Sequence, residues 1–383
     1  MKSDTKIGAS NRREFLTGSA GLLMGGMMGS FAFPAKTASP FANAFAGRFP
    51  AADASPRRII IDTDPGIDDA MAILLALRSP ELKIEAITPV SGNVPLDLTL
   101  PNALRLVEIA GRTDVPVAAG ARVPLVRHLV TATYAHGENG LAGVEFPAPK
   151  TKPVAESAAE MIAHVVRNHP GEVTIVAIGP LTNIATALRA DPAITGLIKD
   201  IVLMGGSLSG GNISPSAEFN IYVDPEAARA VFHAGIPFTM VGLDVTRKVV
   251  LRDEHIAALE AGTNPSSQAA GRIMRATMER FRKAGMTGGP NMHDPLALAT
   301  VLDPGVVTLR DYYVEIETAG EVTAGETIGY LRGPIRRSAP LETGLAMPSS
   351  SPDEPFRPNA KVAVEVDPDR FFRLLIGRLT SAM

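Results

Sequence analysis

The chain of 383 residues contains no cysteine and no tryptophan. Because cysteine is absent, disulfide bonds, thiolate metal sites and a cysteine nucleophile are all excluded. The chain also lacks a strong excess of charge, since 37 basic residues face 40 acidic ones and the formal net charge is −3. Such a balance provides no electrostatic footprint for nucleic acid. We therefore expect the partner to be a small molecule and not a nucleic acid.

Residues 1–50 have the character of a targeting segment rather than of a folded unit. The sequence Asn11-Arg12-Arg13-Glu14-Phe15-Leu16 resembles the twin-arginine export signal, and a Gly-rich, weakly apolar run follows over residues 17–33. We expect a signal peptide with a flexible segment here, export by the twin-arginine machinery, and a periplasmic or otherwise exported protein. The alternatives are a disordered tail with a chance arginine pair, or a signal retained as a membrane anchor.

From residue 57 onward, short apolar stretches alternate with amphipathic ones. Strands are expected at 58–62, 83–89, 173–178, 200–204 and 238–243, and helices at 100–110, 183–188, 225–233 and 251–260. This alternation is typical of an α/β fold whose open, mostly parallel β-sheet is flanked by helices, as in Rossmann-like cores.

The last part of the chain predicts two further strands, at 312–317 and 361–366, and then a helix that starts after Val366-Asp367-Pro368. Between these strands, residues 348–355 are rich in proline and serine, which is typical of an exposed loop. No stretch before this loop resembles a linker, so a single domain is expected over residues 57–383.

Four carboxylates stand within eight residues in Asp62-Thr63-Asp64-Pro65-Gly66-Ile67-Asp68-Asp69, between an apolar strand and an apolar helix over residues 70–77. Carboxylates crowded on one loop repel each other, and a hard cation such as Ca²⁺ or Mg²⁺ relieves that repulsion. Because α/β sheets bind ligands at the carboxyl ends of their strands, the position favours a metal site over helix capping alone. A metal without chemistry and a phosphorylated aspartate are further alternatives.

More polar motifs follow the other predicted strands. They are Val90-Ser91-Gly92-Asn93-Val94, Ile178-Gly179-Pro180-Leu181-Thr182-Asn183, Met204-Gly205-Gly206, Gly210-Gly211-Asn212, Ala217-Glu218-Phe219-Asn220 and Met292-His293-Asp294-Pro295. If the strands are parallel, the loops after them line one crevice. A crevice with a metal site and many hydrogen-bonding groups suits a polyhydroxylated ligand such as a sugar.

Taken in order, these motifs resemble those of the nucleoside hydrolases, the inosine-uridine-preferring nucleoside N-ribohydrolases. The stretch from Asp62 to Ala70 is similar to the N-terminal signature of the family. The match continues through Gly92-Asn93-Val94, His136-Gly137-Glu138-Asn139-Gly140-Leu141 and the later motifs to His293-Asp294-Pro295. The resemblance covers essentially everything after residue 57. It implies a bound Ca²⁺, hydrolysis of ribonucleosides to free base and ribose, and a homodimer or homotetramer.

The resemblance also implies a role for each matched residue. The implied Ca²⁺ ligands are Asp64, Asp69, Asp294 and the backbone carbonyl of Ile178, a position that is often Thr in relatives. The implied substrate-binding residues are Asp68, Asn93, His136, Met204, Asn212, Glu218 and Asn220. Asp64 would act as the general base on a metal-bound water, and His293 would protonate or hydrogen-bond to the departing base.

Some of these residues have simpler explanations. Asn93 and Asn183 could cap helices, Met204 could be ordinary core, and His136 could be a surface or core group. The whole chain could instead be a nucleoside- or pentose-binding protein, or a phosphotransferase with an Asp nucleophile, although no Gly-rich phosphate loop is present.

Base preference stays open at this point. One purine-selective branch of the family stacks the base against Trp, which this chain lacks, and this weakens a strictly purine-specific interpretation. Residues 281–287, shortly before His293, are the predicted specificity segment.

Overall fold

The computed structural model describes residues 55–331 and 357–382. Its eight strands form one sheet in the order β2-β1-β3-β4-β5-β8-β6-β7. They are β1 (Arg57–Thr63), β2 (Leu82–Pro89), β3 (Thr174–Ala177), β4 (Asp200–Met204), β5 (Phe238–Val241), β6 (Val307–Ile316), β7 (Thr327–Tyr330) and β8 (Ala360–Val366). The first six strands in this order pair in parallel, whereas β6 runs antiparallel to both β8 and β7. The predicted open, mostly parallel sheet is therefore confirmed.

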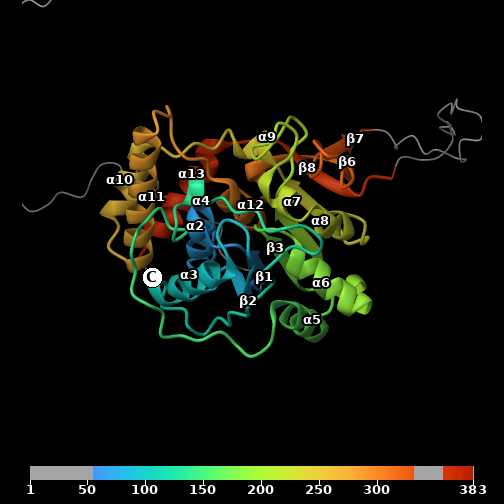
Figure 1. Cartoon of the computed structure of the whole chain (residues 1–383). Helices are drawn as coiled ribbons and strands as arrows, with labels where there is room; N and C mark the ends of the chain where they lie inside the picture. Colours follow the sequence, from blue (N-terminus) through green and yellow to red (C-terminus); the bar gives the residue numbers. More distant parts are fainter. Residues whose placement is uncertain (1–54, 332–356, 383) are drawn as a thin grey trace, which may run out of the picture. The chain divides into compact units, whose positions relative to one another are not determined.

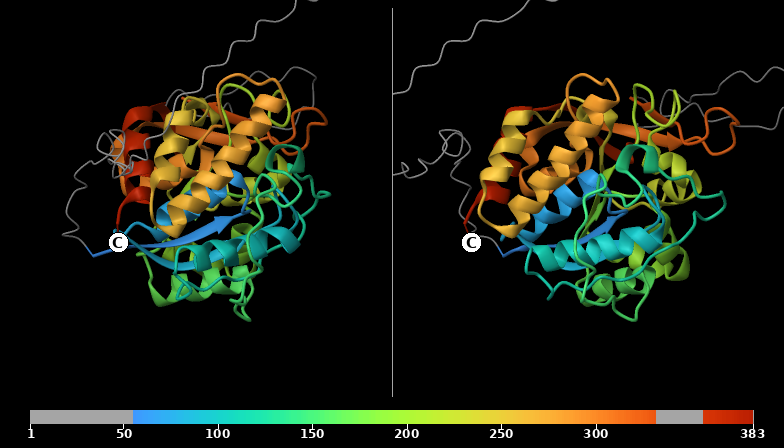
Figure 2. Two further views of the ribbon diagram at one scale, coloured as in Figure 1. Left: turned by 90° about the vertical axis from the view of Figure 1, so that its left-hand side faces the viewer. Right: turned by 60° about the vertical axis from the view of Figure 1, so that its left-hand side comes forward.

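Helices cover both faces of the sheet. One layer contains α2 (Ile67–Leu77), α3 (Leu96–Ile109), α10 (Asp253–Ala261), α11 (Pro265–Lys283), α12 (His293–Leu302) and α13 (Pro368–Thr380), and the other contains α5 (Ala158–Asn168), α6 (Thr182–Ala190) and α8 (Pro225–Phe232). In Figures 1 and 2, the green helices α5 and α6 lie across the sheet from blue α2 and orange α11.

The side chains of β1 show how the sequence builds these two layers. Ile59 and Ile61 belong to the core on one face, and Ile60 belongs to the core on the other. Successive side chains of a strand point to opposite faces, so a strand covered on both sides is apolar throughout. The helix that follows, α2, is buried along its whole length. The Asp-rich loop therefore joins the buried end of β1 to a fully buried helix.

The predicted elements are confirmed with small changes of their ends. β4 has the predicted bounds, while β6 starts at Val307, before the expected residue 312. Helices α5 and α11 and strand β7 were not predicted. The predicted signal segment and the loop over residues 348–355 lie outside the described residues.

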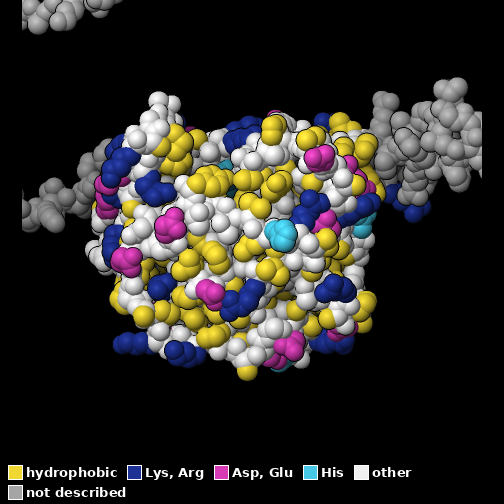
Figure 3. All heavy atoms as spheres, viewed as in Figure 1, with side chains coloured by type: hydrophobic (Ala, Val, Ile, Leu, Met, Phe, Trp, Pro, Cys, Tyr) yellow, Lys and Arg dark blue, Asp and Glu magenta, His cyan; other side chains and the backbone are white. Residues whose placement is uncertain are grey.

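Two further observations concern the distribution of surface charge and the hydrophobicity of the helices. On the face drawn in Figure 3, basic and acidic side chains are interspersed. Within residues 55–331 and 357–382, no helix is both long and apolar enough to cross a membrane.

Candidate functional site

A cavity opens at the carboxyl ends of the parallel strands, where the predicted site residues meet. It is lined by Asp68, Asn93, Ala132, Tyr134, Ala135, His136, Ile178, Met204, Asn212, Glu218, Phe219, Asn220, His293 and Asp294. This set includes every predicted site residue except Asp64 and Asp69. Those two are fully buried and hydrogen-bond to the lining residue Asn93. The fold thus gathers residues from one end of the chain to the other into a single site.

Asp69 holds the Asp-rich loop in shape. One of its oxygens accepts hydrogen bonds from the Thr63 hydroxyl (2.6 Å) and the Asp64 amide (3.1 Å). The other accepts from the Gly66 amide (3.0 Å) and the Asn93 side chain (2.9 Å). Because Asp69 lies in the first turn of α2, where free N–H groups favour an anion, this carboxylate also stabilises the start of the helix.

Only one of the two carboxylate oxygens of Asp64 accepts a hydrogen bond. Its Oδ2 atom accepts a hydrogen bond from the Asn93 amide (2.7 Å). Its Oδ1 atom is buried and has no hydrogen-bond partner among the described residues. Burial raises the pKa of Asp64 well above its usual value, and the nearby charge of Asp69 raises it further. A buried carboxylate oxygen without a partner is costly unless a ligand satisfies it.

Two glycines leave just enough room for this carboxylate. A Cβ atom added at Gly92 would lie 2.0 Å from Asp64 Oδ2, and one added at Gly179 would lie 2.8 Å from Oδ1. Neither position could therefore take a larger residue without displacing Asp64.

If Asp64 has the role that the family resemblance implies, Gly92→Ala should lower kcat for nucleoside hydrolysis by about 10²-fold, because small displacements of catalytic groups have effects of this order. Gly196→Ala is the matched control, since a Cβ atom there meets nothing within 4 Å. Rates and melting temperatures of both variants check this. A Gly92→Ala enzyme as active as the control would show that the placement of Asp64 does not matter.

Three carboxylates form the tightest acidic group of the site. One oxygen each from Asp68, Asp69 and Asp294 lie within 4.8 Å of one another, and all three residues are buried. Burial and the neighbouring Asp69 raise the pKa of Asp68 to about 7, and burial with the neighbouring aspartates raises the pKa of Asp294 well above normal. Among the described residues, no lysine or arginine forms an ion pair with these groups.

This group fits a hard divalent cation. All the candidate ligands are oxygen atoms and their charges repel, since the charge of Asp64 helps to raise the pKa of Asp294. The Oδ1 atom of Asp64 is also free of hydrogen bonds among the described residues. The trio contains Asp68, which the resemblance places among the substrate-binding residues, and does not contain Asp64. The Ile178 carbonyl, the fourth implied ligand, lines the cavity and accepts a hydrogen bond from the Asn220 side chain (3.3 Å).

The wall opposite these aspartates is built around the short helix α7 (Phe219–Val223). Glu218 precedes this helix and accepts hydrogen bonds from the amides of Asn220 (3.0 Å) and Gly206 (3.0 Å), while burial raises its pKa to about 7. Asn220 also donates to the Met204 carbonyl (3.1 Å), and the Asn212 side chain accepts from the Phe219 amide (2.9 Å). These residues present polar groups suited to sugar hydroxyls.

Two histidines stand at the cavity. His136 ends the short helix α4 (Thr133–His136), and its Nδ1 atom accepts a hydrogen bond from the Ile67 amide (3.0 Å). This acceptor role requires an unprotonated Nδ1, so the proton of the neutral ring is on Nε2. His293 Nδ1 lies 2.7 Å from the Thr246 hydroxyl. Desolvation lowers the pKa of both histidines to about 4, so both rings are neutral near pH 7.

Neither Asn93 nor Asn183 caps a helix, which was the simpler explanation considered for each. Asn93 does not cap α3, because its side chain donates to the Asp64 carbonyl (3.2 Å) and to Asp69. Asn183 lies inside α6 and donates to Asp62 Oδ2 (2.9 Å). Asp62 is fully buried, and burial raises its pKa to about 7. The hydrogen bond from Asn183 to Asp62 thus joins α6 to the end of β1, next to the Asp-rich loop.

Four of the residues that line the cavity were not predicted from the sequence. Ala132, Tyr134, Ala135 and Phe219 line the cavity, whereas residues 281–287, the predicted specificity segment, are not among its lining residues. The position of Tyr134 just before the His136 motif was the one available signal.

Comparisons with known proteins identify the family to which the chain is similar. The model of the inosine-uridine preferring nucleoside hydrolase family matches residues 59–373. A pyrimidine-specific ribonucleoside hydrolase RihA from Citrobacter koseri is 42% identical over 326 residues, which cover 84% of this chain and 97% of the relative.

Two solved structures are also similar. A plant nucleoside hydrolase has a TM-score of 0.76 at 35% identity, covering 85% of this chain and 100% of the other. A purine-preferring ribonucleoside hydrolase from Gardnerella vaginalis has a TM-score of 0.75 at 32% identity, covering 85% and 98%.

Proposed function

Because this chain belongs to the inosine-uridine preferring nucleoside hydrolase family, we propose that it hydrolyses the N-glycosidic bond of ribonucleosides, pyrimidine ribonucleosides above all, to free base and ribose. The relatives are named ribonucleoside hydrolases, and the chain is an enzyme of that class. The observation that carries the proposal is the group of buried aspartates beside a cavity lined with carboxylate, amide and imidazole groups.

We propose that Ca²⁺ is the cofactor and that Asp64, Asp69, Asp294 and the Ile178 carbonyl hold it. The oxygen-only donor set and the unpartnered Oδ1 of Asp64 support this assignment. A bound Ca²⁺ would orient the attacking water and lower its pKa.

The residues of the chain then divide the chemistry between them. The carboxylate of Asp64 removes a proton from the water that attacks C1′ as the C1′–N bond breaks. Positive charge builds up on the ribosyl ring in this step, and the carboxylates of Asp68 and Glu218 stabilise it. Asn93, Asn212 and Asn220 bind the ribose hydroxyls, and Met204 packs near the sugar.

The histidines act on the other parts of the substrate. Since its ring is neutral near pH 7, His293 serves the departing base as a hydrogen-bond donor rather than as a preformed imidazolium. His136 presents its Nε2–H group from α4 and contacts the base or the 5′ end of the ribose.

Pyrimidine preference rests on the 42% identity to the pyrimidine-specific relative, against 32% to the purine-preferring structure. The test is kcat/KM for uridine, cytidine, inosine, adenosine and guanosine. We expect the pyrimidine nucleosides to exceed the purine ones by about tenfold or more, the range that pocket contacts provide. Faster hydrolysis of inosine than of uridine would reject the preference while leaving the reaction class intact.

We further propose export by the twin-arginine machinery to the periplasm, and assembly as a homodimer or homotetramer. The Arg12-Arg13 motif supports the first, and family membership supports the second. A reporter fused to residues 1–56 should reach the periplasm, and its retention in the cytoplasm would reject export. Light scattering on the purified protein measures the oligomeric state, and a monomer would reject the assembly.

A further inference from the structure

We propose that Tyr134, in α4, is the aromatic platform on which the nucleobase rests, and that it is a specificity-determining residue of the site. The inference rests on the proposed function, since it takes the substrate to be a nucleoside. Three observations support it: the exposure of the Tyr134 side chain, the hydrogen bonds that fix the backbone around Tyr134, and the mixture of polar and apolar residues that line the cavity.

Among the ring-bearing residues that line the cavity, Tyr134 has the freest side chain. Phe219 is only 7% exposed and packs in a small core with Ala132 and Val223. His136 and His293 each use a ring nitrogen in a contact with the protein. Tyr134 is 68% exposed although it lines the cavity. An exposed aromatic ring at the mouth of a polar site is an available surface for a flat apolar ligand.

Hydrogen bonds hold the backbone around Tyr134 to the Asp-rich loop, to Asn93 and to α11. The Ala132 amide donates to the Asn93 carbonyl (3.0 Å), and the Ile67 amide donates to His136 (3.0 Å). Between these two anchors, the Arg280 guanidinium of α11 donates to the carbonyl of Tyr134 itself (3.2 Å). The backbone position of Tyr134 is therefore set relative to the aspartates, while its side chain stays 68% exposed.

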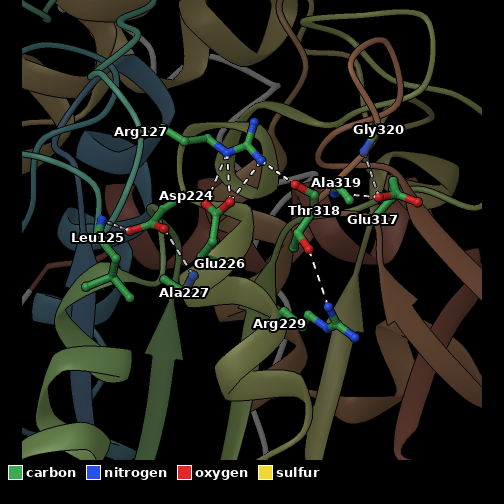
Figure 4. Close-up of polar contacts among 10 residues, drawn as sticks. All are labelled: Leu125, Arg127, Asp224, Glu226, Ala227, Arg229, Glu317, Thr318, Ala319 and Gly320. Atoms are coloured by element: carbon green, nitrogen blue, oxygen red, sulfur yellow. Dashed lines mark hydrogen bonds and ion pairs between the residues drawn. The ribbon is translucent and has the colours of Figure 1, made fainter.

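The stretch of chain that leads into α4 is also clamped, as Figure 4 shows. The Leu125 amide donates to the buried Asp224 (2.8 Å). Arg127 forms an ion pair with Glu226 (2.8 Å) and donates to the Thr318 carbonyl (2.6 Å). These contacts hold the approach to α4 against α8 and the segment after β6, so α4 is supported from both sides.

The polarity of the cavity gives the substrate one orientation. Its lining combines aspartates and asparagines, which suit the ribose, with Ala132 and Ala135, which lie near Tyr134 in the chain at α4. A nucleoside whose ribose binds the aspartates and asparagines therefore has α4 available for its base. Bases stack on aromatic rings because every base has a π-face, so the ring of Tyr134 and not its hydroxyl is the contact expected to hold the base.

The test uses Tyr134→Ala, Tyr134→Phe and, as the matched control, Val126→Ala. Val126 is 73% exposed on the same stretch of chain and does not line the cavity. The measurements are KM and kcat for uridine, and the inhibition constant of ribose, which lacks a base. We expect Tyr134→Ala to raise the uridine KM about 5- to 100-fold, the range found for loss of base stacking. The ribose constant should stay at the parent value, and Tyr134→Phe and Val126→Ala should resemble the parent.

Three results would overturn the proposal. The first is a uridine KM in Tyr134→Ala equal to that of the parent. The second is an equal loss of uridine and ribose affinity in Tyr134→Ala, which would indicate a structural role. The third is an equal rise of the uridine KM in Tyr134→Phe and Tyr134→Ala, which would assign the effect to the hydroxyl. If the parent chain hydrolyses no nucleoside, the proposed function fails by itself. Uridine and ribose binding are then compared by calorimetry in the same variants, and that comparison decides the role of Tyr134.

Discussion

Replacing Asp64 with asparagine is expected to lower kcat for uridine about 10²- to 10⁴-fold, the range for loss of a general base. Asparagine has the same shape and can still accept the hydrogen bond from the Asn93 amide through its Oδ1 atom. It cannot take up a proton, however. The variant should therefore keep its fold and lose its chemistry, which circular dichroism and initial rates measure together.

The control for this variant is Asp97→Asn, because Asp97 is an exposed carboxylate that pairs with Arg122 on the surface. Exposed pairs of this kind contribute little to stability, so the control should match the parent. Calorimetric titration of Asp64→Asn with Ca²⁺ separates loss of the base from loss of the metal. Turnover of Asp64→Asn near the level of Asp97→Asn would reject Asp64 as the base.

Removal of Ca²⁺ by a chelator is expected to abolish turnover and to lower the melting temperature, and added Ca²⁺ should restore both. Without a cation, Asp64, Asp68, Asp69 and Asp294 are buried with like charges near one another and no cationic side chain paired to them among the described residues. A ligand that binds only the folded state stabilises it by about 4 kcal/mol at a free concentration 1,000 times its Kd.

The stability measurement makes this expectation specific to the site. The melting temperature of the parent should rise with Ca²⁺ concentration, and that of Asp294→Asn should rise much less, because Asp294 is buried in the acidic group. Chelation of Asp97→Asn should have the same effect as chelation of the parent. Full turnover and an unchanged melting temperature in metal-free protein would contradict the Ca²⁺ assignment.

The sequence predicted the parts of the site that depend on local order. Asp64, Asp68 and Asp69 follow one another between a strand and a helix, so one turn determines their arrangement. Strands such as β1 and β4 were also predicted closely, because burial on both faces gives each of them a continuous apolar run, over residues 59–61 and 201–204.

The errors came from contacts between distant segments. Asn183 looked like a helix cap but reaches Asp62, which is 121 positions away in the chain. The segment around Tyr134 is positioned by two contacts with distant parts of the chain, from the Ala132 amide to the Asn93 carbonyl and from Arg280 to the Tyr134 carbonyl. Helix α5 does have a local sequence signal, the capping box of Ser157 and Glu160, but it was not predicted because it adjoins no predicted strand or polar motif.

The most direct test of the account is the product analysis of uridine incubated with the Ca²⁺-loaded protein in phosphate-free buffer, with Asp64→Asn as the blank. The account predicts free uracil and free ribose in equal amounts, formed by the parent and almost absent with the variant. Bound but unchanged uridine, or equal product formation by parent and variant, would contradict it.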